Sequence, residues 1–417
     1  MNFKLITLGC KVNFYESNAL REMFLEAGFL ENEKEPDVVV VNTCSVTAVA
    51  DQKSRQIIRR HKRNHPNAII VVMGCYSQKN AEYIEKECGG NIIVGTSNRS
   101  KIIDFINKYL KDKKNIIAID KDTRKLTYES FLVHITPDST RAYIKVEDGC
   151  NNFCSYCTIP YTRGVARSRP KQEIIDEITY LISKGYKEFV LSGIHTAHYG
   201  MDLENETFSD LLEEIVNIPG LYRVRISSIE ESEIDDKMIA LLGKYPNIAN
   251  HLHMPLQSGS STVLKRMNRK YNVDDFLKKV ERIREVRPDI AITTDVIVGF
   301  PGETDEEFEE TFNFIKKINF SELHVFPFSA RENTPAWYMK DKVSPAVKQE
   351  RVRRLIALSD ELNKAYYDRF VGQELEVILE ERNKATGLLS GFTSNYLKLS
   401  ADYPDEYIGR VVTVKVR

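Results

Sequence analysis

Short, almost continuously apolar runs alternate with amphipathic helical patterns through most of this chain. Runs such as residues 37–44 (DVVVVNTC) and 68–75 (AIIVVMGC) leave no polar face, which indicates strands that are buried on both sides. Strands of this kind, separated by helices, form parallel sheets with helices packed on both faces. The chain is therefore predicted to be an α/β protein.

Changes in this alternation divide the 417 residues into three predicted domains. Residues 1–135 should form a doubly wound parallel-sheet domain that ends in a polar connection over 111–140. Residues 136–368 contain six strand–helix repeats, fewer than the eight of a closed barrel, and predict a laterally open, partial (βα)6 barrel. After a long amphipathic helix over 345–370, residues 369–417 alternate with period two, which predicts a small antiparallel β-barrel or sheet.

Composition excludes several classes of protein. The 59 Lys and Arg residues nearly cancel the 60 Asp and Glu residues, so net charge indicates no partner. Every apolar run is much shorter than the roughly 20 residues of a membrane span, and the N-terminus lacks a secretory pattern. Seven cysteines, an odd number, argue against a disulfide framework and fit a reducing compartment where thiols bind metal. We expect a cytoplasmic protein without membrane contact.

Three cysteines within eight residues form the sharpest motif. Cys150, Cys154 and Cys157 follow the spacing C-x3-C-x2-C. This spacing can place three thiolates around one face of a four-iron cluster, and no fourth cysteine follows nearby, so one iron would stay open to another ligand. The alternatives are a zinc site or three free thiols. Structural zinc takes four protein ligands in paired spacing, and no second C-x2-C or His pair follows.

Three further cysteines stand at the ends of predicted strands. Cys10, Cys44 and Cys75 each close an apolar run. Because the carboxyl ends of parallel strands share one edge of a sheet, where ligands bind, these thiols should converge and hold a second cluster. The alternative, structural thiols, would place them inside the strands. Cys88 lies in a predicted helix and is expected to be a half-buried free thiol.

Several motifs resemble those of the radical S-adenosylmethionine (SAM) methylthiotransferases. CNNFCSYC ahead of a partial barrel resembles radical SAM enzymes, and the added three-cysteine N-terminal domain and β-rich tail resemble the methylthiotransferases. The resemblance covers essentially the whole chain. The forms CKVN and NTCSVT are similar to the branch that acts on threonylcarbamoyladenosine in tRNA. Branches that act on isopentenyladenosine or a ribosomal protein carry other residues there.

The resemblance implies a tRNA methylthiotransferase that converts N6-threonylcarbamoyladenosine beside the anticodon to its 2-methylthio derivative. It implies two [4Fe–4S] clusters and two molecules of SAM. The cluster at Cys150, Cys154 and Cys157 would bind SAM and produce a radical, and an auxiliary cluster at Cys10, Cys44 and Cys75 would carry the sulfur. The implied partners are a tRNA anticodon stem-loop, an electron donor such as flavodoxin or ferredoxin, and a sulfur source. Two alternatives stay open: a methylthiotransferase acting on a ribosomal protein side chain, and a non-catalytic iron–sulfur RNA-binding scaffold.

Polar residues at the predicted strand ends are candidate contacts to SAM or substrate. Tyr156 lies between two cysteines and could meet the adenine of SAM, although a packing role is equally consistent with its position. His195 and His198 lie in a loop that could meet substrate, whereas His251 and His253 are predicted to line the barrel. The full set of predicted cofactor contacts is Tyr156, Ser192, Gly193, Arg225, Ser227, Glu230 and Gln257.

Three basic stretches are candidate phosphate contacts for RNA. One follows the cysteine loop over 158–171, the second spans 262–271, and the third spans 51–66. For each of them a solvated helix face is the alternative. The predicted RNA-binding residues are Arg163, Arg167, Arg169, Lys265, Arg266 and Arg269. The tail resembles a TRAM domain, an RNA-binding β-barrel, but residues 370–417 hold six basic and seven acidic residues and so form no basic platform.

Overall fold

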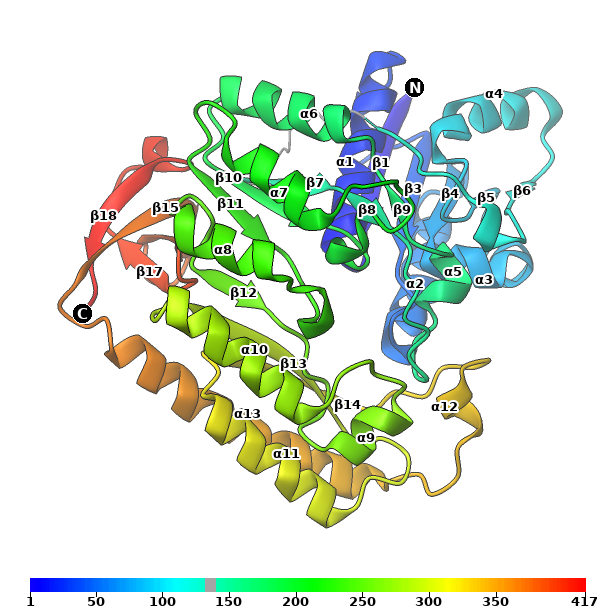
Figure 1. Cartoon of the computed structure of the whole chain (residues 1–417). Coiled ribbons are helices and arrows are strands. Elements are labelled where there is room, and N and C mark those ends of the chain that lie inside the picture. Colours follow the sequence, from blue (N-terminus) through cyan, green and yellow to red (C-terminus); the bar gives the residue numbers. More distant parts are fainter. Residues whose placement is uncertain (132–139) are drawn as a thin grey trace.

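The computed structural model describes residues 1–131 and 140–417 and contains a parallel sheet in each predicted α/β region (Figure 1). The predicted boundary between the first two domains, at residue 135, lies outside the described residues. Elsewhere the order of strands and helices follows the alternation of the sequence. Within the described residues no helix has the length and apolar character needed to cross a membrane.

The N-terminal region is built on a six-stranded parallel sheet with the order β2–β1–β3–β4–β5–β6. Val38 and Val40 of β3 pack in a cluster with residues of α1 and α4, whereas Val39 and Val41 pack on the opposite face with residues of α2 and α3. The continuous apolar runs are thus buried on both faces, as predicted. The strands are β1 (Asn2–Thr7), β2 (Leu30–Glu31), β3 (Val38–Thr43), β4 (Ile69–Gly74), β5 (Ile92–Val94) and β6 (Ile116–Ala118). The helices are α1 (Lys11–Glu26), α2 (Ala48–Asn64), α3 (Cys75–Tyr83), a π-helical turn (Ile84–Cys88) and α4 (Ile102–Asp112).

Two strands of this sheet were not expected from the sequence. Both lie at its edges: β2 has two residues, and β6 has three residues inside the stretch predicted as a polar connection. Both residues of β2 are exposed and β6 is half-exposed, and neither strand shows a continuous apolar run or a clear alternation, so pattern analysis misses them.

The central region forms the predicted partial barrel. Two three-stranded parallel sheets, β7–β10–β11 and β12–β13–β14, are joined by a parallel bridge between Val224 and Ile248. No pairing among the described residues connects β14 back to β7, so the barrel is open on that side. The strands are β7 (Arg141–Lys145), β10 (Glu188–Ser192), β11 (Arg223–Ile226), β12 (His251–His253), β13 (Ala291–Val298) and β14 (Glu322–Pro327). The covering helices are α6 (Lys171–Ser183), α7 (Phe208–Val216), α8 (Asp236–Lys244), α10 (Val273–Val286) and α11 (Asp305–Ile318).

The C-terminal region is a four-stranded antiparallel sheet that follows the long helix α13 (Pro345–Asp368). Its order is β17–β16–β15–β18, which fits the predicted TRAM-like fold. Tyr366 of α13 donates a hydrogen bond to the carbonyl oxygen of Asp289 at 2.8 Å, which ties this region to the barrel. The strands are β15 (Glu374–Arg382), β16 (Leu389–Thr393), β17 (Lys398–Ala401) and β18 (Val411–Lys415).

Candidate active site

Cys150, Cys154 and Cys157 line one cavity of about 200 Å³ at the carboxyl end of the barrel strands. The loop that carries them turns sharply, because the Cys157 amide donates to the carbonyl oxygen of Cys154 at 2.9 Å. Ser155 fixes the loop by donating from its backbone amide to Met267 at 2.9 Å. Burial raises the pKa of Cys157 to about 12, so iron binding would displace a proton from this thiol. Three thiols at one cavity, with no fourth cysteine in its lining, fit a [4Fe–4S] cluster with one open iron.

Glu230 is the centre of the polar wall of this cavity. Arg269 approaches its carboxylate at 2.8 Å, Asn152 donates to it at 2.9 Å, and His195 lies 3.2 Å away. Burial alone would raise the pKa of Glu230, but the hydrogen bond from His195 and the charge of Arg269 outweigh burial and lower it to about 2. Glu230 is therefore a carboxylate at neutral pH, placed beside three thiols.

Cys10, Cys44 and Cys75 lie together at the carboxyl edge of the N-terminal sheet. Cys10 precedes α1, Cys44 follows β3, and Cys75 is the first residue of α3. Gly9 has a φ of +109°, and a β-carbon there would lie 3.1 Å from Cys44 Sγ, so the loop before Cys10 touches Cys44. Burial, reinforced by the neighbouring thiols of Cys44 and Cys10 and opposed by Arg163, raises the pKa of Cys75 to about 12. These three thiols fit an iron–sulfur cluster in the same way as the first set.

A second, larger cavity of about 500 Å³ lies between the two halves of the site. Cys10 and Lys11 line it from the N-terminal region, and Gly193 and Ser227 line it from the barrel. Ser228 lines both this cavity and the cavity of Cys150, so the two adjoin. The thiols of Cys150, Cys154 and Cys157 therefore line one cavity, and Cys10 of the other set lines the cavity that adjoins it.

Comparisons with known proteins agree with this arrangement. A model of the Radical SAM superfamily matches residues 144–315, and one of the uncharacterized protein family UPF0004 matches residues 2–95. Threonylcarbamoyladenosine tRNA methylthiotransferase MtaB of Bacillus subtilis is 47% identical over 416 residues, which cover 98% of this chain and 92% of that protein. The chain belongs to the radical SAM methylthiotransferase family.

Two further matches are to a related tRNA-modifying enzyme and to a solved structure. The tRNA-2-methylthio-N(6)-dimethylallyladenosine synthase of Caldicellulosiruptor saccharolyticus is 36% identical, over 99% of this chain and 89% of that protein. Among solved structures, the radical SAM methyltransferase TsrM of Kitasatospora setae superposes with a TM-score of 0.58 at 16% identity, over 80% of this chain and 73% of that one. The second match shows a shared fold only.

Five of the predicted cofactor contacts of this methylthiotransferase line the two cavities. Tyr156, Glu230 and Gln257 line the smaller cavity, and Gly193 and Ser227 line the larger one. The prediction also missed residues there: His195, weighed only as a possible substrate contact, and Asn152 both reach Glu230.

Two predicted contacts, Arg225 and Ser192, line neither cavity. Arg225 binds Glu188 at 2.8 Å and donates to the carbonyl oxygen of Thr393 at 3.1 Å, so it joins the barrel to the C-terminal sheet. Ser192 donates its hydroxyl hydrogen to the carbonyl oxygen of Ile144 at 3.2 Å within the barrel sheet. Both side chains are buried, and each forms hydrogen bonds inside the protein, as buried polar groups generally do.

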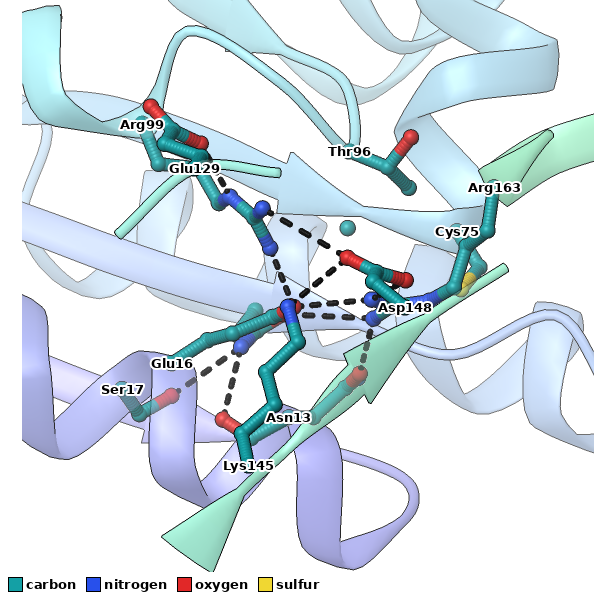
Figure 2. Close-up of polar contacts among 12 residues, drawn as sticks. Asn13, Glu16, Ser17, Cys75, Thr96, Arg99, Glu129, Lys145, Asp148 and Arg163 are labelled. Atoms are coloured by element: carbon teal, nitrogen blue, oxygen red, sulfur yellow. Dashed lines mark hydrogen bonds and ion pairs between the residues drawn. The ribbon is translucent and has the colours of Figure 1, made fainter. Parts of the chain in front are cut away.

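A buried ionic cluster joins the two cysteine sets, and Figure 2 shows its members pointing toward one another. Arg163 donates to Glu16 at 2.7 Å, to Asp148 at 3.0 Å and to Asn13 at 2.8 Å. Lys145 lies 2.9 Å from Glu16 and 2.7 Å from Asp148, and Arg99 also pairs with Glu16. Burial alone would raise the pKa of Glu16, but these cations hold its pKa well below the usual range. The sequence signal was available: residues 145–148 place three charges directly before Cys150.

The arginines predicted to bind RNA lie mostly in the interior, which corrects that prediction. Arg163 is fully buried in the ionic cluster, Arg167 donates to the carbonyl oxygens of Arg163 and Val165, and Arg169 pairs with Glu177 at 2.6 Å. These guanidinium groups are occupied by protein acceptors and do not face solvent phosphates.

In the second basic stretch, two of the three predicted residues are likewise paired with protein groups. The side chain of Arg269 is 3% exposed and donates to Cys154 Sγ at 3.3 Å. Arg266 forms a two-pronged pair with Glu307 at 2.6 and 2.8 Å, and Lys265 is exposed. Of the six residues predicted to bind RNA, Lys265 keeps a position suited to a phosphate contact. Cys88 was predicted to be half-buried, but it is fully buried with Ile84 in the apolar cluster beside α2.

Proposed function

We propose that this protein is a tRNA methylthiotransferase that converts N6-threonylcarbamoyladenosine beside the anticodon to its 2-methylthio derivative. The observation that carries the proposal is the pair of adjoining cavities, one lined by Cys150, Cys154 and Cys157 and the other reached by Cys10. A reaction that replaces a C–H hydrogen by a sulfur group needs a radical source and a sulfur source at one substrate, and this arrangement provides for both. The name of the Bacillus subtilis relative supports the choice of substrate.

The cofactors of the proposal are two [4Fe–4S] clusters and SAM. Cys150, Cys154 and Cys157 would hold one cluster, and the other three cysteines, Cys10, Cys44 and Cys75, would hold the auxiliary cluster. When bound, these groups and two molecules of SAM supply the radical that removes the adenine C2 hydrogen and the sulfur and methyl group that replace it.

The protein's own residues would bind, orient and shield these groups. Glu230, kept ionised by Arg269 and His195, offers a carboxylate to a cationic or hydroxyl group of SAM in the smaller cavity. Tyr143 lines the larger cavity and offers an aromatic ring to a base. The base would have to leave the anticodon loop to enter this cavity, which is easiest for an unpaired nucleotide.

The proposed partners are an anticodon stem-loop, a one-electron donor of the flavodoxin or ferredoxin class, and a source of sulfur. Mass spectrometry of tRNA nucleosides from cells with and without the gene tests the activity. We expect loss of the 2-methylthio form and accumulation of threonylcarbamoyladenosine. An unchanged nucleoside profile would contradict the proposal. Loss of a methylthio group from a ribosomal protein in cells without the gene would support the protein methylthiotransferase instead.

The division of labour between the two cysteine sets has its own test. Replacing Cys10, Cys44 and Cys75 with Ala should halve the iron content and abolish methylthiolation while leaving cleavage of SAM to 5′-deoxyadenosine intact. Cys88→Ala is the matched control, because Cys88 packs among apolar residues, and iron content should not change. Failure of the reconstituted wild-type protein to form 5′-deoxyadenosine under reducing conditions would favour a non-catalytic scaffold.

A further inference from the structure

We infer that Lys11 and His251 form an anion-binding subsite in the larger cavity, and that its ligand is the threonyl carboxylate of the modified adenosine. This inference rests on the proposed function and adds the group that selects the substrate. Both residues line the cavity of about 500 Å³, which is within the size range of small-ligand sites.

Lys11 is a cation that forms no ion pair with the residues that the structure describes. Its ammonium group donates to the hydroxyl oxygen of Ser227 at 2.9 Å, and no carboxylate of the described residues forms an ion pair with it. Asp295 is the one carboxylate among the residues that line the cavity, and it lies 3.3 Å from His253. A positive charge held in a cavity without a negative partner favours an anionic ligand.

The position of Lys11 in its helix does not explain the charge. Lys11 is the first residue of α1, and the first turn of this helix contains no acidic residue. The N-terminus of a helix carries a partial positive charge, so a cation there destabilises the helix slightly. Helix stability would favour an acidic or neutral residue, so it gives no reason for a lysine at this position.

His251 supplies a second, independent observation. Its side chain is buried, Nε2 is hydrogen-bonded to Thr293 Oγ1 at 2.9 Å, and Nδ1 is buried without a partner. The imidazole stacks on Tyr396, with ring centroids 4.3 Å apart, which fixes its orientation. Buried polar atoms in native proteins nearly always have a partner, so an unpaired atom in a cavity wall indicates a polar ligand.

The chemistry of the substrate matches this pair of groups. On adenine, the reactive C2 and the N6 substituent lie on the same edge of the base, on either side of N1. A base whose C2 faces the cysteines would therefore direct its N6 substituent along the same side of the cavity, where Lys11 follows Cys10. The threonylcarbamoyl group ends in a carboxylate and a hydroxyl, whereas a dimethylallyl group has neither. Sites built to bind a polar group reject analogues that lack it.

The test removes the negative charge of the ligand and the positive charge of Lys11 in turn and measures RNA binding. Anticodon stem-loop RNA carrying threonylcarbamoyladenosine, and the same RNA carrying its neutral methyl ester, are bound to reconstituted wild-type, Lys11→Gln and Lys11→Arg proteins without reductant. We expect wild type to bind the acid about ten- to a hundredfold more tightly than the ester. The ratio should fall toward one in Lys11→Gln and be largely kept in Lys11→Arg. Lys53→Gln, an exposed lysine on α2, should keep the wild-type ratio.

Each outcome separates the inference from the function on which it rests. If Lys11→Gln weakens acid and ester equally, Lys11 binds a backbone phosphate and the inference is overturned. Equal binding of acid and ester by wild type overturns it as well. If wild type discriminates by charge through Lys11 but forms no 2-methylthio product under turnover conditions, the subsite stands and the proposed function fails. Because the ratio is measured within each variant, a general loss of affinity does not mimic the effect.

Discussion

Arg163 Nε lies 3.2 Å from Cys75 Sγ. Arg163 ends the short helix α5 (Ile159–Arg163) that follows Cys157, whereas Cys75 belongs to the N-terminal cysteine set. The loop of one cysteine set thus supplies a hydrogen-bond donor to the other. Hydrogen bonds to cluster sulfurs are one of the protein's means of adjusting a cluster, so this contact links the two halves of the site chemically as well as structurally.

Arg163→Met should destabilise the protein strongly. The substitution leaves Glu16 and Asp148 short of a cation inside the protein, and breaking a buried pair in this way costs about 3–5 kcal/mol. The midpoint of thermal unfolding measures the loss. Arg353→Met is the control, since Arg353 pairs with Glu350 on the surface, where a pair contributes about 0–1 kcal/mol. Equal shifts in the two variants would show that the buried cluster does not stabilise the fold.

Gly9→Ala should remove iron from the auxiliary site. A β-carbon at Gly9 would lie 2.8 Å from Cys44 Cβ, so the cysteine must move. We expect the iron content to fall toward half while formation of 5′-deoxyadenosine continues. Gly28→Ala is a matched control, because Gly28 also has a positive φ but has no atom within 4 Å of the added carbon. Gly28→Ala should cost about 1–2 kcal/mol of stability and leave iron unchanged.

Stability should depend on pH through Glu188. Burial alone would raise the pKa of Glu188, but Arg225 and Arg223 outweigh it and lower the pKa below the unfolded value of about 4.3. The unfolded chain then binds the proton first, so this contribution is present above about pH 4.3 and is lost as pH falls below it.

Glu188→Gln should therefore lower the unfolding midpoint at pH 7, by a change equivalent to about 3–5 kcal/mol. The difference in unfolding midpoint between the variant and wild type should narrow as pH falls below about 4.3. Glu381→Gln, in an exposed pair with Lys398, should change the midpoint little at either pH. A gap that stays constant with pH would contradict an ionised Glu188 in the folded protein.

Arg269 and Lys265 should separate SAM chemistry from RNA binding. Arg269 contacts Cys154 and Glu230, so Arg269→Gln should slow formation of 5′-deoxyadenosine and leave the dissociation constant for tRNA unchanged. Lys265 is exposed, so Lys265→Gln should weaken tRNA binding and reduce its salt dependence by about one counter-ion. If Arg269→Gln weakened tRNA binding but left SAM cleavage normal, the original prediction that Arg269 contacts RNA would be supported instead.

Long-range topology followed closely from the sequence where the signal was strong. The runs at β3 and β4 predicted strands buried on both faces, and Cys44 and Cys75 follow them directly, so their convergence at one sheet edge could be expected. The six repeats of the partial barrel were predicted for the same reason. The short edge strand β6 was missed, because a half-exposed strand of three residues carries no periodic signal.

Side-chain partners could not be predicted in this way. Arg163, Arg167 and Arg169 form a basic cluster in sequence, yet their partners Glu16, Asp148 and Glu177 come from three different parts of the chain. A guanidinium group has the same charge whether it faces RNA or a buried carboxylate, and only burial distinguishes the two. The partner of Arg225 could not be predicted for the same reason, since Glu188 lies on the neighbouring strand.

The sequence by itself determined the order of the main strands and helices, the two sets of cysteines and the family of the protein, because these depend on local periodicity and on ligand spacing. The tertiary structure decided which charges are occupied and which are free. It places the arginines near Cys157 in interior ion pairs, whereas no carboxylate within residues 1–131 and 140–417 pairs with Lys11 beside Cys10. Ion pairing depends on distances between segments that are remote in the chain, so it is fixed only when the N-terminal sheet and the barrel come together.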